Sequence, residues 1–122
     1  MPPFFGRAKH LLRHPEELLI MLTSALAKAY AKRRTLYRVF GDFLLLFRLV
    51  RAWVRGEYRD VPRKSVFWAI FAILYFLSPI DLIPDIFPGG YLDDIAVISF
   101  VVRRIKGDLD KFSGWEKAKK NG

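Results

Sequence analysis

The chain contains no cysteine among its 122 residues. This absence excludes disulfide bonds, thiolate metal sites and a cysteine nucleophile, and it is consistent with a reducing compartment. The first ten residues also lack the apolar core, roughly 7–15 residues long, that a signal peptide requires. We therefore expect a protein that is not secreted.

The common catalytic motifs are missing as well. The sequence has no glycine-rich phosphate loop and no HExxH zinc motif, and serine is too scarce to suggest a Ser-His-Asp triad. We therefore expect no catalytic residues and no resident cofactor, apart from a divalent cation considered below.

Acidic residues are few compared with basic ones. Twenty-one Lys and Arg against 12 Asp and Glu give a formal net charge of +9. Such an excess favours anionic partners, namely lipid headgroups, nucleic acid or an acidic protein, with a solvated basic surface as the ordinary alternative. Hydrophobic residues make up 52% of the chain, which is slightly more than in typical soluble domains.

Prolines and glycines divide the chain into about four expected helices within a single domain, residues 1–122. The first helix begins near Pro15, because proline suits the first helical position. The others span about 36–55, 66–77, and from after Gly90 to about Lys106. The fold class is thus all-α: a small bundle that includes a short apolar helical hairpin, Val66–Lys106. Residues 1–60 form a basic amphipathic part, 61–106 the hairpin part, and 107–122 a polar, frayed tail in which Phe112 and Trp115 are candidate anchors.

The second expected helix is amphipathic and basic. At 100° per residue its apolar residues, from Leu36 to Val54, share one face. A basic amphipathic helix can lie on an anionic membrane surface, although an ordinary bundle helix with a solvated arginine face has the same pattern. The candidate lipid-contacting side chains on the opposite arc are Arg34, Arg38, Arg48, Arg51 and Arg55.

The third segment, 66–77, carries no charge and no polar stripe, which predicts a helix that is buried on all sides. Twelve helical residues span roughly 18 Å, whereas the hydrocarbon core of a bilayer is roughly 30 Å thick. Basic residues precede this helix (Arg63, Lys64) and end the next (Arg103, Arg104), and basic flanks favour the cytoplasmic side. The pattern favours a hairpin that enters the membrane from the cytoplasm. The alternative is a buried hairpin inside a soluble bundle.

The strongest local motif is SPIDLIPDIFPGGYLDD, which joins the two apolar segments. Its first serine and proline suit a helix start, and its later prolines and glycines break the helix and form a turn. Its carboxylates fit helix caps and ion pairs, and a shared site for calcium or magnesium is the alternative. A carboxylate acid–base pair is a weaker third reading, because no nucleophile stands nearby. The candidate metal ligands are Asp81, Asp85, Asp93 and Asp94.

The same motif resembles the signature of the YkvA-like family, domain of unknown function 1232. The resemblance covers roughly residues 63–104, with Gly89 as a mild departure where the family often has a larger apolar residue. It implies a small bacterial membrane protein, and it implies no activity. The residues that carry the resemblance are Ser78, Pro79, Asp81, Pro84, Asp85, Pro88, Gly90, Tyr91, Asp93 and Asp94.

Two smaller features complete the candidates. His10 and His14 are four residues apart, a spacing that can hold zinc, and Glu17 is near, but two surface histidines are the favoured interpretation. The basic run 32–34 lacks the exposed aromatics or helix-turn-helix pattern of a nucleic-acid site. We therefore do not expect nucleic acid as a partner.

The sequence thus predicts a small, membrane-associated, helical interaction or scaffold protein that is not an enzyme. Its expected partners are anionic lipid and either a membrane protein or a second copy of the chain. The alternatives are a carboxylate-based divalent-metal module, with or without enzymatic activity, and a soluble nucleic-acid-binding bundle.

Overall fold

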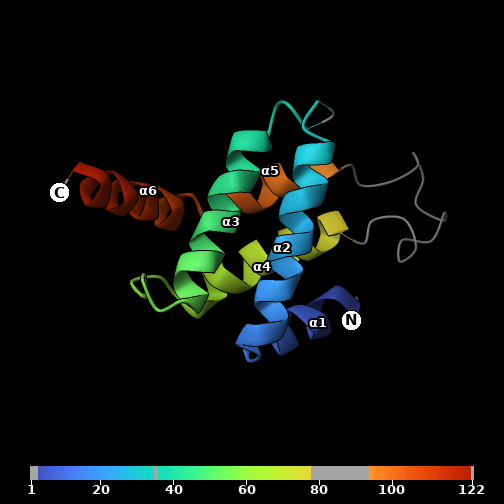
Figure 1. Cartoon of the computed structure of the whole chain (residues 1–122), viewed down its shortest axis with the longest axis horizontal. Coiled ribbons are helices and arrows are strands. Elements are labelled where there is room, and N and C mark those ends of the chain that lie inside the picture. Colours follow the sequence, from blue (N-terminus) through green and yellow to red (C-terminus); the bar gives the residue numbers. More distant parts are fainter. Residues whose placement is uncertain (1–2, 35, 78–93, 122) are drawn as a thin grey trace.

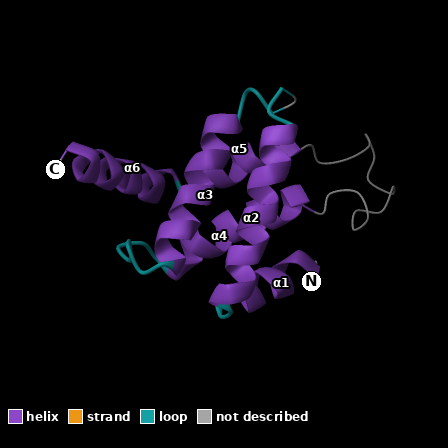
Figure 2. Ribbon diagram, viewed as in Figure 1, coloured by secondary structure: helices purple, strands orange, loops and turns teal. Residues whose placement is uncertain are grey.

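The computed structural model describes residues 3–34, 36–77 and 94–121. Within these ranges the chain forms α-helices and no strand, which confirms the all-α prediction (Figure 2). The expected number of about four helices was wrong, because the described ranges hold six. They are α1 (Pro3–Leu12), α2 (Pro15–Ala31), α3 (Phe40–Val54), α4 (Arg63–Leu77), α5 (Asp94–Arg104) and α6 (Lys106–Asn121).

Helix α4 is the centre of the fold. It packs against α1, α2, α3 and α5, and in Figure 1 α2 and α3 lie side by side in front of α4 and α5. Its residues from Ala69 to Phe76 are buried, except for the half-buried Phe71. The prediction of an apolar helix that pairs with the next one is therefore confirmed. The prediction that it is buried on all sides was wrong, because Phe67, Trp68 and Phe71 are only half-buried. Among the described helices, none has both the length and the apolarity needed to cross a membrane.

Helix α2 begins where the sequence places it. Pro15 occupies the first turn, and Glu16 and Glu17 lie near the positive end of the helix dipole. Leu18 and Leu22 are fully buried, as their helical spacing predicts.

Helix α3 begins at Phe40, four residues later than expected. Residues 36–39 form a turn instead, in which the Val39 N–H donates to the Leu36 carbonyl at 2.8 Å. The helix ends in a Schellman motif. The Glu57 N–H donates to the Ala52 carbonyl at 2.9 Å, and Gly56 adopts a φ of 76°.

The predicted frayed tail is instead helix α6, which projects from one side of the bundle in Figure 1. Gly107 and Gly114 weaken this helix, because a glycine inside a helix costs roughly 1 kcal/mol relative to alanine. Burial of Leu109 and Phe112 offsets this cost.

Polar contacts and stacked rings fix the start of α6. The Ser65 hydroxyl donates a short hydrogen bond to Asp108, and Lys111 Nζ lies 2.8 Å from the Asp60 carboxylate. The ring of Phe112 packs edge-on against Tyr58, with centroids 5.1 Å apart. Together these contacts hold α6 against the start of α4 and against the loop that joins α3 and α4.

Helix α1 is also absent from the sequence prediction. Its Ala8 and Leu11 are buried, and it packs against α4 and α2. It therefore covers part of the apolar central helix.

Candidate functional site

Most of the signature motif lies outside the described residues. These positions are Ser78, Pro79, Asp81, Pro84, Asp85, Pro88, Gly90, Tyr91 and Asp93. The backbone of Asp94 begins α5. The expected divalent-cation ligands therefore lie outside the described part of the structure, apart from the backbone of Asp94.

The ammonium group of Lys28, on α2, lies at the C-terminal end of α4, immediately before the motif. Lys28 Nζ donates to the carbonyl oxygens of Phe76 at 2.8 Å and Leu77 at 3.4 Å. The same ammonium lies 5.1 Å from the centre of the Phe76 ring. The last carbonyls of a helix are partly negative and have no partner within the helix, so the lysine both satisfies them and stabilises the dipole. Residue Lys28 was not among the sequence candidates.

The connection between α2 and α3 carries an exposed group of cations and tyrosines, which we call the basic–aromatic patch. The Tyr30 side chain is held by an edge-on contact with Phe40, whose ring centre is 5.3 Å away. Residue Arg33 donates to the Tyr30 carbonyl at 2.7 Å, and Arg38 donates to the Tyr37 hydroxyl at 3.0 Å. All members of the patch are exposed: Tyr30, Lys32, Arg33, Arg34, Tyr37 and Arg38.

The five arginines expected to contact lipid do not share one environment. Arg34 and Arg38 belong to the basic–aromatic patch, whereas Arg55 is exposed at the opposite end of α3. Arg51 is half-buried, with its guanidinium 5.4 Å from the Phe47 ring centre. Arg48 is paired with an acidic residue of α6, so its charge is partly neutralised.

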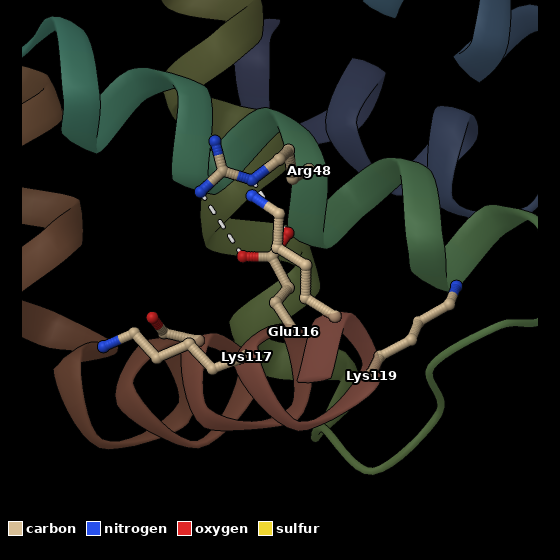
Figure 3. A pocket seen from close by; sticks show the side chains of 6 residues that line it. Arg48, Glu116, Lys117 and Lys119 are labelled. Carbon is tan, nitrogen blue, oxygen red and sulfur yellow. Dashed lines mark hydrogen bonds and ion pairs between the residues drawn. The ribbon is translucent and has the colours of Figure 1, made fainter. Parts of the chain in front are cut away.

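The pairing partner of Arg48 is Glu116. Arg48 Nε donates to Glu116 Oε2 at 2.8 Å, and its Nη2 lies 3.3 Å from Oε1 (Figure 3). A groove of about 700 Å³ opens around this pair between α3 and α6. Lysines surround it, which makes it a second basic surface. Its lining consists of Arg48, Ser113, Glu116, Lys117, Lys119 and Lys120.

An aromatic strip runs along α4 and α5. Trp68 makes edge-on contacts with Phe67 and Phe71, and with Phe100 of α5. The Arg104 guanidinium lies 4.8 Å from the Trp68 ring centre. Phe100 is 49% exposed, while the α4 members are half-buried. The sequence flagged Arg104 only as a basic flank, and its stacking on Trp68 became evident only from the packing of α4 and α5.

A cluster of two histidines and a glutamate lies at the corner between α1 and α2. His10 Nε2 lies 2.9 Å from Glu17 Oε2, and His14 Nδ1 lies 2.7 Å from the His10 carbonyl oxygen. The two imidazoles are stacked, with ring centres 3.9 Å apart. The hydrogen bond from His10 is the main cause that holds the pKa of Glu17 below its ordinary value, so this carboxylate is charged at neutral pH.

Comparison with known proteins matches the chain to a protein family and to a relative. Residues 65–100 match the family model described as Protein of unknown function (DUF1232). The chain is also 34% identical over 97 residues to a Bacillus subtilis (strain 168) protein named "Uncharacterized membrane protein YkvA". This alignment covers 79% of the chain and 92% of the relative. No solved structure matches the chain.

Proposed function

The chain belongs to the YkvA-like family of unknown function (DUF1232), and from this premise we propose that it is a membrane-associated interaction protein that binds anionic lipid headgroups through the basic–aromatic patch. The Bacillus subtilis relative is named a membrane protein, which supports the membrane part of the proposal. The exposed charges and tyrosines of the basic–aromatic patch support its choice as the lipid-binding surface.

One observation carries the proposal: two tyrosines and four cations are exposed within residues 30–38. Tyr30 and Tyr37 are 49% and 68% exposed, although large apolar rings are usually covered. Tyrosine is favoured at the membrane–water interface, because its ring is apolar and its hydroxyl is wet. Each lysine or arginine near an anionic leaflet contributes about 1 kcal/mol. The four cations of the patch would together strengthen binding on the order of 1000-fold.

The other expected arginines have a smaller part in this proposal. Glu116 offsets the charge of Arg48, and Arg55 lies at the far end of α3 from the patch. Fifteen helical residues separate the two ends by roughly 22 Å, which is more than two Debye lengths at physiological salt. A flat membrane that touches the patch end-on therefore gains little from Arg55.

The embedded hairpin is the alternative arrangement. Helices α1, α2 and α3 already cover α4, so insertion of α4 and α5 into lipid would require these three helices to separate from α4. Binding through the patch requires no such rearrangement. We therefore place the surface mode first and the embedded hairpin second.

Vesicle flotation tests the patch directly. We expect the full chain to float with phosphatidylglycerol-containing vesicles and to remain at the bottom with pure phosphatidylcholine. The triple variant Arg33→Gln, Arg34→Gln, Arg38→Gln should bind roughly 100-fold more weakly. The matched control removes three exposed charges from α6 instead, by Lys117→Gln, Lys119→Gln and Lys120→Gln, and should lose much less. Equal losses in the two variants would mean that the net charge, and not the patch, provides the binding.

Washing a membrane pellet distinguishes the two membrane arrangements. Release by high salt supports the patch, whereas resistance to salt and alkaline carbonate until detergent is added supports the embedded hairpin. A protein that never pellets and instead binds DNA in a salt-sensitive way would contradict both and favour the nucleic-acid alternative.

A further inference from the structure

We infer that His10, His14 and Glu17 form a binding site for a divalent transition-metal ion, with Zn²⁺ as the ion that best fits the donors. One ligand atom from each residue lies within 4.8 Å of the others. Two imidazole nitrogens and one carboxylate oxygen form a donor set that zinc uses with water in the fourth position. All three side chains are exposed, so an ion can reach them from solvent.

The backbone already orients one of the ligands. His14 Nδ1 lies 2.7 Å from the His10 carbonyl oxygen, which can only accept a hydrogen bond. Nδ1 of His14 therefore carries the proton, and in the neutral ring Nε2 presents its lone pair. A hydrogen bond of this kind, from the non-ligating nitrogen to a backbone carbonyl, typically fixes the tautomer of metal-binding histidines.

The second pair of donors needs little movement to accept an ion. His10 Nε2 and Glu17 Oε2 are 2.9 Å apart. In a tetrahedral zinc site with bonds of roughly 2.0–2.1 Å, neighbouring ligand atoms lie about 3.3 Å apart. Zn²⁺ would therefore replace the hydrogen bond after a separation of a few tenths of an ångström. His10 Nε2 would give up its proton to solvent, and Nδ1 of the same ring would take one from solvent, so that Nε2 offers its lone pair to the ion.

The turn between the helices fixes the backbone of the site. The Arg13 N–H donates to the His10 carbonyl and the His14 N–H donates to the Leu11 carbonyl, both at 3.1 Å. This turn brings Glu17 of α2 to the end of α1. A metal ion would therefore link the two helices and stabilise the packing of α1 on α4.

The donor set also predicts which ions bind. Calcium and magnesium prefer sites built entirely of oxygen atoms, whereas imidazole suits zinc and its neighbours. The positive charge of Arg7, which acts on Glu17, weakens the attraction for any cation. The nitrogen donors therefore determine the selectivity.

Calorimetry on the tag-free full chain tests the site. Zn²⁺ should bind with one-to-one stoichiometry and should raise the Tm, while Mg²⁺ should give no heat. Each of the variants Glu17→Gln and His14→Gln should weaken zinc binding by at least roughly tenfold. The matched control is Glu16→Gln, which removes the neighbouring exposed carboxylate outside the cluster and should bind zinc like the original chain.

Either of two results would overturn the inference. One is the absence of saturable zinc binding to the original chain. The other is an equal zinc affinity in the Glu17 and Glu16 variants, which would place any bound ion elsewhere. Circular dichroism spectra of the metal-free variants should match that of the original chain, because all three side chains are exposed. Matching spectra would show that a loss of zinc binding is not caused by a loss of folding.

Discussion

Lys28 of α2 donates a hydrogen bond to the carbonyl oxygen of Phe76 at a distance of 2.8 Å, although 48 residues separate the two in the chain. The bond caps the C-terminal end of the central helix immediately before the signature motif.

The first prediction concerns this contact. Lys28→Met should lower the free energy of unfolding by about 1–2 kcal/mol, because it leaves carbonyls at the end of α4 without their charged donor. Urea denaturation measures the change. Lys32→Met removes a nearby exposed lysine and is the matched control, and equal stability of the two variants would contradict the role of Lys28.

The end of α3 gives a paired prediction for two glycines. Gly56→Ala should destabilise the protein by about 1–2 kcal/mol, because the Schellman motif holds Gly56 at a φ of 76°, where a Cβ is strained. Gly41→Ala, inside α3 with open space around its Cβ, should instead stabilise by about 0.5–1 kcal/mol. Thermal melts of both variants check the opposite signs. Changes of the same sign would show that the two glycines do not differ in this way.

The docking of α6 gives a third prediction. Phe112→Ala should cost about 3 kcal/mol or more, because the ring is 1% exposed and packs against Tyr58 and Trp115. Lys117→Ala, on the exposed side of the same helix, should have little effect. Guanidinium unfolding and amide hydrogen exchange along α6 measure both. Rapid amide hydrogen exchange along α6 in the unmodified chain would instead support the frayed tail that the sequence predicted.

A fourth prediction concerns the acidic motif. Asp81→Ala and Asp94→Ala should each lower the stability by about 0.5–2 kcal/mol even with all metal chelated, since the sequence pattern predicts that both carboxylates stabilise helix starts. Asp110→Ala removes an exposed carboxylate that pairs only with Lys106 among the contacts described, and it should change the melting temperature little.

The metal-module alternative makes a different prediction for the same residues. Unchanged melting in both the Asp81 and Asp94 variants would refute the capping role. Saturable calcium, magnesium or manganese binding that these variants abolish would support the alternative.

Local patterns determined the parts of the fold that depend on one helix at a time. The spacing of Leu18 and Leu22 predicted the buried face of α2, and the charge-free run 66–77 predicted the apolar central helix, although Phe67, Trp68 and Phe71 leave one side of it half-buried. Both predictions succeeded because helical periodicity directly reports which side chains avoid water. The motif around residues 78–94 likewise indicated the family, which the match to the model and to the relative confirmed.

Local patterns misled where tertiary contacts outweighed them. Gly107 and Gly114 have low helix propensity, yet α6 forms because Leu109 and Phe112 find a buried surface on the rest of the bundle. The expectation that the basic run 32–34 lacks exposed aromatics was wrong, since Tyr30 and Tyr37 are exposed beside it. An isolated exposed ring has no periodic signature in the sequence.

The sequence by itself therefore determined the helical class, the central apolar helix, the excess of positive charge and the family. Only the tertiary structure decided what covers α4 and that Lys28 reaches the end of that helix. The physical reason is that periodicity and propensity are properties of a short segment, whereas the contact of Lys28 with the end of α4 joins two helices that are far apart in the chain. Their meeting depends on how every helix packs, and no single segment encodes it.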